Sequence, residues 1–96
     1  MSKEVKARDF QKYLAQQLKN PEVKKHYDEY DKQLEIAYQI LKLRKQKKLS
    51  QKELAKRLGT KQSNIARMEA GQQNFSIRML NNIAKVLKAN LSIRLF

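Results

Sequence analysis

Apolar positions recur at helical spacing from the start of the chain. In the first segment they fall on one side of a helix, at Phe10, Tyr13, Leu14 and Leu18. Asn20-Pro21 interrupts this pattern, because a proline disfavours helical backbone at the residue before it. Pro21 is itself suited to the first position of a new helix. The sequence therefore predicts one short helix and a second helix that begins at Pro21.

A longer apolar stripe follows in steps of three and four residues. Its positions are Val23, Tyr27, Tyr30, Leu34, Ala37 and Leu41. An adjacent second stripe contains Ile36, Ile40 and Leu43. Two stripes are typical of a helix that lies between neighbours, whereas one stripe suits an exposed helix. The pattern leaves open whether residues 22–47 form one helix or two, since Asp31 could serve as an N-cap in the middle.

Short helices with their own start and stop signals follow this region. Ser50 and Glu53 have the spacing of a capping box, which satisfies free amides at a helix start. Gly59 is placed to end that helix in the left-handed conformation. Thr60 can cap the next helix, and Gly71 can end it.

The end of the chain predicts one more helix and then a strand. Ser76 can cap the helix and Asn90 can end it. Residues 91–96 alternate as Leu-Ser-Ile-Arg-Leu-Phe, which predicts a short β-strand. A single strand cannot satisfy its own backbone, so it would pair with its copy in a dimer or with an edge on a partner. The alternative is a frayed tail.

Composition agrees with a small all-α protein. The 96 residues include only 2 Gly and 1 Pro, which favours long helices, and 41% are hydrophobic, which allows one small core. There is no Cys, which fits a reducing cytoplasm and excludes disulfides and thiolate metal sites. No signal peptide is recognisable, and no apolar run approaches the roughly 20 residues that span a bilayer. We expect a cytoplasmic protein with no membrane partner, no metal and no cofactor.

Charge is divided unevenly along the chain. The formal net charge is +13, from 22 basic and 9 acidic residues. Residues 1–35 hold eight basic and seven acidic side chains, whereas residues 36–96 hold 14 basic and two acidic ones. Such a basic segment attracts polyanions, of which nucleic acid is the first to consider. The division indicates two surfaces with two different partners.

The segment from Leu49 to Gly71, LSQKELAKRLGTKQSNIARMEAG, closely resembles the helix-turn-helix of the lambda-repressor-like (Xre/Cro) family. This resemblance implies a five-helix DNA-binding domain. Two short helices joined by a tight turn allow one to enter the major groove of duplex DNA while the other braces across the backbone. The matching positions are Gln51, Leu54, Ala55, Gly59, Gln62, Ser63, Ile65, Arg67, Glu69 and Gly71.

The second helix of this motif presents polar side chains that can reach base edges. Glutamine matches the N6/N7 pair of adenine, and arginine or lysine matches the O6/N7 pair of guanine. With Ile65 in the core, the outward residues are Lys61, Gln62, Asn64 and Arg67, and the resemblance adds Ser63 as base-facing. Lysine is less usual at position 61 in the family, so Lys61 could hold a phosphate instead of a base.

The resemblance also implies phosphate contacts on both sides of that helix. Gln51 would bind a backbone phosphate, and the loop with Gln72 and Asn74 would lie by the opposite one. Phe75 stands where the family often has proline, which leaves the course of this loop open. Lys48 is a further phosphate candidate because it is close to Gln51 in the chain.

The basic run 44–48 has functional interpretations other than phosphate binding, and Arg44, its first residue, is assigned a separate structural role. The run could be a targeting signal or a solvated helix end favoured by the helix dipole. The resemblance pairs Arg44 with Glu69 as a structural ion pair that braces the fold.

Residues 1–30 exceed the roughly 60 to 65 residues that such a domain needs. The amphipathic start, Asn20-Pro21-Glu22-Val23, the Tyr-rich acidic stretch and the closing strand resemble HigA-type antitoxins. This resemblance implies a dimer that represses its own operon at double-stranded operator DNA and neutralises a small basic toxin, a RelE-like ribonuclease. We therefore expect an N-terminal helical extension (1–30), a helix-turn-helix domain (31–90) and a C-terminal strand (91–96).

Residues 1–35, which we call the front half, offer a surface for such a toxin. Acidic side chains attract a basic partner, and tyrosines anchor interfaces well. The alternative is that the tyrosines are core residues and the acids form a solvated face. The toxin-binding candidates are Phe10, Leu14, Leu18, Tyr27, Asp28, Tyr30 and Asp31.

Other function classes have weaker support in the sequence. His26 is the one histidine, and the sequence shows no cysteine and no clustered acid-base pair in a pocket-forming context, so we expect no enzymatic activity and place His26 at the surface. A free-standing Xre-type repressor without a toxin partner is the main alternative. A basic module for RNA or a membrane surface is disfavoured, because the chain lacks interleaved exposed aromatic residues for stacking bases.

Overall fold

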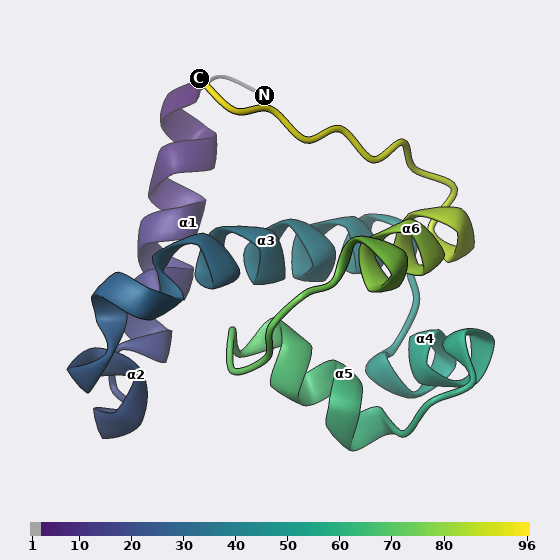
Figure 1. The fold of residues 1–96 in the computed structure, drawn as a ribbon, viewed down its shortest axis with the longest axis horizontal. Helices are drawn as coiled ribbons and strands as arrows, with labels where there is room; N and C mark the ends of the chain where they lie inside the picture. Colours follow the sequence, from purple (N-terminus) through teal and green to yellow (C-terminus); the bar gives the residue numbers. More distant parts are fainter. Residues whose placement is uncertain (1–2) are drawn as a thin grey trace.

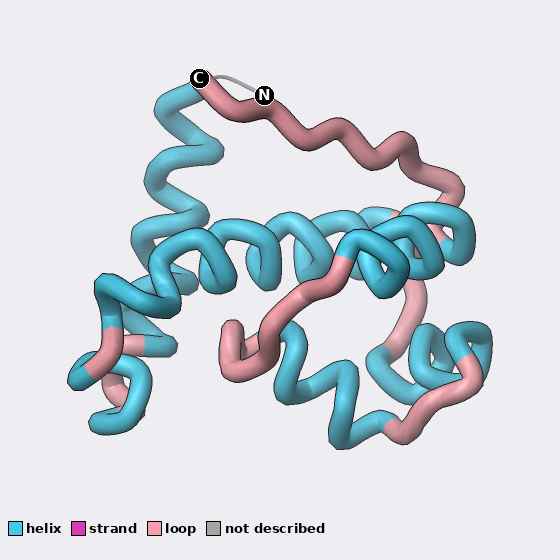
Figure 2. Tube along the Cα trace, viewed as in Figure 1, coloured by secondary structure: helices cyan, strands magenta, loops and turns pink. Residues whose placement is uncertain are grey.

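A computed structural model describes residues 3–96 of the chain and its side chains from Arg8 onward. All regular structure in this part of the chain is α-helical, as Figures 1 and 2 show. The all-α prediction is therefore confirmed, but residues 31–90 hold four helices and not the five that the resemblance implies. The helices are α1 (Lys3–Gln17), α2 (Pro21–Lys25), α3 (Tyr27–Gln46), α4 (Gln51–Leu58), α5 (Gln62–Glu69) and α6 (Ile77–Val86).

The region 22–47 forms two helices, α2 and α3. Pro21 begins α2 as predicted, and the Asn20 side chain caps it by accepting a hydrogen bond from the Glu22 amide at 2.9 Å. The two helices separate at His26 (φ −113°, ψ 30°) and not at Asp31, which lies inside α3. This break lets α2 leave the axis of α3 (Figure 1) and bury Val23 completely, so the break depends on packing and not on a capping residue.

The long helix α3 is shared by two apolar clusters, as its two stripes predicted. The first stripe packs in the cluster formed with α1 and α2, which we call the front cluster: Tyr13, Leu14, Val23, Leu34 and Ala37. The second stripe packs in the cluster formed with α4, α5 and α6, which we call the rear cluster: Ile40, Leu49, Leu54, Ala55, Ile65, Met68, Ile83 and Leu87. Phe75, in the loop before α6, packs against both clusters.

Local capping signals fix the ends of α4 and the start of α6. Ser50 Oγ accepts from the Glu53 amide at 3.0 Å, and the Glu53 carboxylate accepts from the Ser50 amide at 3.0 Å. Gly59 ends α4 with φ 70°, and Ser76 Oγ accepts from the Met79 amide at 3.0 Å. The predicted capping box, glycine stop and serine cap are thus confirmed.

Two other helix boundaries differ from the prediction. The N-cap of α5 is Lys61, which makes no side-chain capping bond, and not Thr60. Thr60 stays in the turn after α4 because its amide donates to the Ala55 carbonyl at 2.9 Å. Helix α6 ends at Val86 and not near Asn90, because Lys88 adopts a left-handed conformation (φ 54°) that turns the chain away.

The predicted strand at 91–96 is wrong for the single chain. Residues 89–96 have no regular structure (Figure 2), because no other extended segment within residues 3–96 is available to pair with them. The tail runs back from α6 toward the start of α1 (Figure 1) and leaves Leu95 and Phe96 exposed. Its first part, with α3 and α6, borders an apolar cavity of about 270 Å³. Within residues 3–96, no helix has the length and apolar character needed to cross a membrane.

Candidate nucleic-acid interface

Helices α4 and α5 pack together as a helix-turn-helix below α3 in the view of Figure 1. Ala55 of α4 is 3% exposed, and Ile65 of α5 is fully buried in the rear cluster. Gly59 supplies the left-handed residue that the turn between the helices requires, since a side chain disfavours that conformation. With Ile65 held in the core, the opposite side of α5 faces solvent.

The solvent side of α5 carries most of the predicted base-reading residues. Lys61, Gln62, Ser63 and Arg67 are exposed at one surface. Asn64 differs, because it is half-buried and its amide nitrogen donates to Thr60 Oγ1 at 2.7 Å. The four exposed side chains offer guanidinium, ammonium, amide and hydroxyl donors to an acceptor-rich partner such as a base edge.

The predicted phosphate-binding residues lie on the elements that flank α5. Lys48 is exposed after α3, with a left-handed backbone (φ 58°), and Gln72 and Asn74 are exposed in the loop after α5. The side chain of Asn74 accepts a hydrogen bond from Gln33 of α3, which fastens this loop to the long helix. Exposed polar groups therefore lie in the loop before α4 and in the loop after α5.

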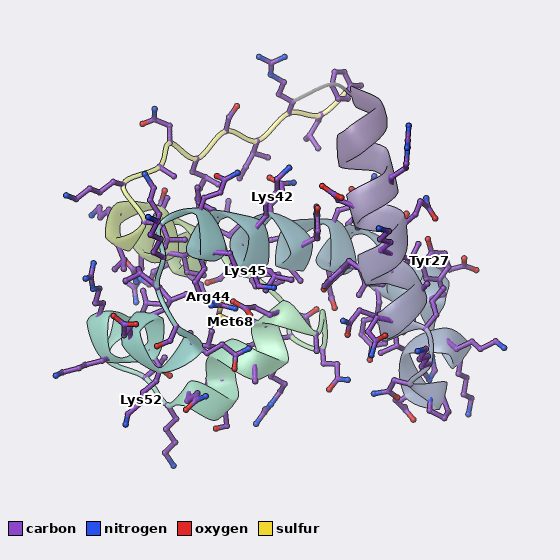
Figure 3. All side chains as sticks on the ribbon, turned by 180° about the vertical axis from the view of Figure 1, so that it is seen from behind. Tyr27, Lys42, Arg44, Lys45, Lys52 and Met68 are labelled. Atoms are coloured by element: carbon purple, nitrogen blue, oxygen red, sulfur yellow. The ribbon has the colours of Figure 1, made fainter. Side chains whose placement is uncertain are left out.

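Gln51, the first residue of α4, is only half-exposed. Its Nε2 donates to Glu69 Oε1 at 3.0 Å, so one N–H of its amide is engaged within the protein. An amide nitrogen has two N–H donors, and the second remains for a phosphate oxygen. Gln51 thus links the start of α4 to the end of α5. Lys52, the next residue, points away from the body of the protein (Figure 3).

Glu69, the last residue of α5, is held by side chains from three other helices. Its carboxylate accepts from Arg44 of α3 at 2.5 Å (Nε) and 2.9 Å (Nη2), in addition to Gln51 of α4. Arg44 Nη1 also donates to the Leu49 carbonyl at 2.7 Å, and Figure 3 labels Arg44 on α3. Arg44 and Glu69 are 8% and 5% exposed, so the pair that the resemblance implies is a buried brace within this motif.

Tyr13 of α1 is the third residue that holds Glu69, and the sequence did not predict this contact. Its hydroxyl donates to the backbone carbonyl of Glu69 at 2.6 Å. Burial, and then the negative charge of Glu69, raise the pKa of Tyr13 well above its usual 10, so the hydroxyl stays protonated as a donor. The two residues are 56 positions apart, and a tyrosine in an apolar stripe predicts burial but not this partner.

The toxin-binding candidates are divided between core and surface. The apolar ones pack within the chain: Leu14 is buried in the front cluster, and Phe10, Leu18, Tyr27 and Tyr30 are half-buried against it. Asp28 is exposed and Asp31 is half-buried, both in the first turns of α3. The structure thus brings all seven to one end of the molecule but turns the apolar members inward.

His26 lies at the surface between two acids, as expected. Its ring nitrogens are 3.7 Å from the carboxylates of Glu22 and Glu29, and its side chain is 34% exposed. Among the described residues, no group of three or more His, Cys, Asp or Glu side chains could hold a metal ion.

The fold and this surface define a DNA-binding regulator of the helix-turn-helix class. Residues 40–93, more than half of the chain, match the helix-turn-helix family model (HTH_3, Xre/lambda-repressor-like), so the chain belongs to that family. It is also similar to the crystal structure of the restriction-modification controller protein C.AhdI from Aeromonas hydrophila. The identity is 30% and the TM-score 0.61, over 66% of this chain and 91% of that one. A search of curated proteins gave no match.

Proposed function

We propose that the protein represses transcription by binding operator DNA as a homodimer, with α5 in the major groove. The exposed face of α5 carries this proposal, because Gln62 and Arg67 offer the side-chain types that pair with adenine and guanine edges. Lys48, before α4, and Gln72, after α5, are exposed candidates for phosphate contacts. The net charge of residues 36–96, which contain 14 basic and two acidic residues, supplies the attraction to duplex DNA.

A dimer follows from how such a domain reads DNA. One helix-turn-helix covers one half-site, and two copies bind half-sites about 10 base pairs apart on a palindrome. The tail at 91–96 supports a dimer, because its exposed Leu95 and Phe96 and its unpaired backbone suit pairing with a second copy or with another partner. The neighbour C.AhdI is described as a controller protein, which agrees with a regulatory role for this chain.

Selection from a randomised duplex library tests this proposal. The expected product is a palindrome with half-sites about 10 base pairs apart, protected in footprinting and bound by two copies of the chain. A lone asymmetric half-site bound by a monomer would contradict the dimer. Equal affinity for selected and scrambled duplexes at matched salt would contradict specific reading altogether.

A second proposal concerns the front of the molecule, which we infer binds a small basic toxin of the RelE-like ribonuclease class. Its support is that residues 1–30 lie outside the matched region 40–93, and that Asp28 and Glu29 are exposed there. Residues 1–35 also have almost no net charge, in contrast to the strongly basic residues 36–96. Exposed carboxylates attract a basic partner and steer its approach. The protein would then be an antitoxin that also represses its own operon.

Co-expression with the small open reading frame adjacent to the gene tests the antitoxin proposal. A stable complex is expected, with a partner that is toxic when expressed alone. Asp28→Lys should weaken this complex without changing operator affinity, whereas Gln62→Ala should change operator affinity without weakening the complex. No complex and no toxicity would favour a free-standing repressor.

A further inference from the structure

A hydrogen bond between the N-terminal helix α1 and the helix α5, among the residues whose side chains the structure describes, has a defined structural role. The last four carbonyls of a helix have no partner within it. In α5 the carbonyls of residues 66, 67 and 68 accept from the amides of Ala70, Gln72 and Gly71 at 3.0 to 3.1 Å. The fourth, that of Glu69, accepts from the Tyr13 hydroxyl at 2.6 Å. Helix α1 therefore completes the C-terminal cap of α5.

This contact matters for α5 because the side-chain bond at the other end of the helix, from Asn64 to Thr60, stays within the adjoining turn and does not reach another helix. Lys61, at its N-cap, makes no side-chain capping bond, and Gln62 and Ser63 in the first turn are exposed. The orientation of α5 therefore depends on Ile65 and Met68 in the rear cluster and on the bonds at Glu69. A rotation about the fixed C-terminal end would move the base-reading side chains at the N-terminal end most.

The front cluster also supports the loop that follows α5. Leu34 packs so closely against Gly71 that an added Cβ would lie 2.4 Å from Leu34 Cδ2. Leu34 belongs to the same cluster as Tyr13, and Phe75 of the loop packs against that cluster too. The front cluster, to which α1 and α2 contribute, thus supports both the end of α5 and the loop that carries Gln72 and Asn74.

Tyr13 is in turn fixed within α1 and α3. Its ring centroid is 5.2 Å from that of Tyr38 and 6.1 Å from that of Phe10, and its side chain is 8% exposed. A tyrosine ring held on several sides directs its hydroxyl in one direction. The bond to Glu69 is therefore built into the docking of α1.

We propose that Tyr13 is a positioning residue for DNA reading: through the Glu69 carbonyl it sets the orientation of α5, so the N-terminal extension is a working part of the DNA-reading unit. This inference rests on the specific DNA binding proposed above. Tyr13 itself touches no DNA in this arrangement. Its loss should therefore reduce discrimination between DNA sequences, and should leave the attraction to phosphates unchanged.

The test compares Tyr13→Phe with the matched control Tyr38→Phe. Both remove one hydroxyl from the same aromatic group, but the Tyr13 hydroxyl donates to α5, whereas the Tyr38 hydroxyl is influenced by the charge of Asp9 on α1. The probes are the duplex that the wild-type chain enriches from a randomised library and a scrambled duplex of equal length, each measured over a range of salt concentrations. All proteins are measured well below their melting temperatures.

Tyr13→Phe should lose roughly three- to tenfold in affinity for the enriched duplex, because α5 would leave the reading orientation more easily and one buried hydrogen bond limits the loss. Its affinity for the scrambled duplex and its salt slope should stay as in the wild type, and Tyr38→Phe should match the wild type on both duplexes. Wild-type affinity in Tyr13→Phe, an equal loss on both duplexes, or the same loss in Tyr38→Phe would overturn the proposal. Enrichment of no duplex would instead overturn specific DNA reading itself, so the two failures are distinct.

Amide hydrogen exchange on the wild-type chain decides the matter if Tyr13→Phe does not fold. Coupling between two sites is reciprocal, so DNA that favours the positioned α5 must also favour the docked α1. Exchange in residues 10–17 should slow several-fold with the enriched duplex and not with the scrambled one. Unchanged exchange in that segment would contradict the positioning role.

Discussion

Arg44 and Glu69 meet at two points, with Arg44 Nε and Nη2 each donating to one oxygen of the Glu69 carboxylate at 2.5 and 2.9 Å. This bidentate geometry joins the last turn of α3 to the end of α5, and both residues are almost fully buried. Removing one member leaves the other charged and without its partner, which is the costly outcome for a buried ion pair.

Arg44→Met should therefore destabilise the protein by about 3–5 kcal/mol, measured as the free energy of unfolding in urea. The double variant Arg44→Met/Glu69→Leu should lose less than Arg44→Met alone, because it leaves no unpaired charge in the core. Wild-type stability in the single variant, or additive losses in the double variant, would contradict a stabilising role for this contact.

The two glycines provide a matched pair of backbone substitutions. Both have left-handed backbones, with φ 70° at Gly59 and 72° at Gly71. A Cβ added at Gly59 meets nothing within 4 Å, whereas one at Gly71 lies 2.4 Å from the Leu34 side chain. Gly59→Ala should cost about 1 kcal/mol from backbone strain alone, and Gly71→Ala about 2–4 kcal/mol from strain and overlap. Equal losses in thermal unfolding would show that the front cluster yields easily at Leu34.

Gln62→Ala and Lys48→Ala separate base reading from phosphate binding. Gln62→Ala should cost about 1–3 kcal/mol at particular base pairs of the selected duplex and relax specificity there. Lys48→Ala should weaken binding to all sequences similarly and reduce the salt slope by about 1. Affinities measured on selected and scrambled duplexes over a salt series check both. An equal loss on both duplexes for Gln62→Ala would remove it from the base-reading residues.

The capping box of α4 predicts part of the acid sensitivity of the protein. The amide of Ser50, and then its hydroxyl, hold the pKa of Glu53 below the usual 4.5. A lowered folded-state pKa contributes stability that is present above the unfolded-state pKa and is lost as the pH falls through the folded-state pKa. Glu53→Gln, which keeps the shape without the titration, should therefore lose less stability than the wild type between about pH 6 and pH 3. Parallel acid curves from urea denaturation at each pH would exclude this contribution.

The features that the sequence predicted correctly depend on neighbouring residues. The Ser50–Glu53 box, the Gly59 stop and the Asn20-Pro21 start each use partners within four positions, so their chemistry is visible in the order of residues. The two stripes of α3 are periodic over five turns, and each stripe faces one cluster.

The features that were wrong or missed depend on contacts elsewhere in the fold. The break at His26 follows from the burial of Val23, and the absence of a strand at 91–96 follows from the absence of a second extended segment in residues 3–96. The bond from Tyr13 to Glu69 spans 56 positions and uses a backbone carbonyl, which carries no residue-type signal. The exposed face of α5 was predictable, since Ile65 fixes which side is buried. The hydrogen bond from the half-buried Asn64 to Thr60 was not predictable.

The sharing of α3 between the two clusters has a consequence for how the molecule unfolds. All four tyrosines pack in or against the front cluster, and none lies on α4, α5 or α6. Helix α3 supplies Leu34 and Ala37 to the front cluster and Ile40 to the rear cluster. Unfolding of α3 therefore removes buried residues from both clusters at once. Cooperative loss of both clusters makes the intrinsic tyrosine fluorescence a reporter for the integrity of α4, α5 and α6, which have no tyrosine of their own.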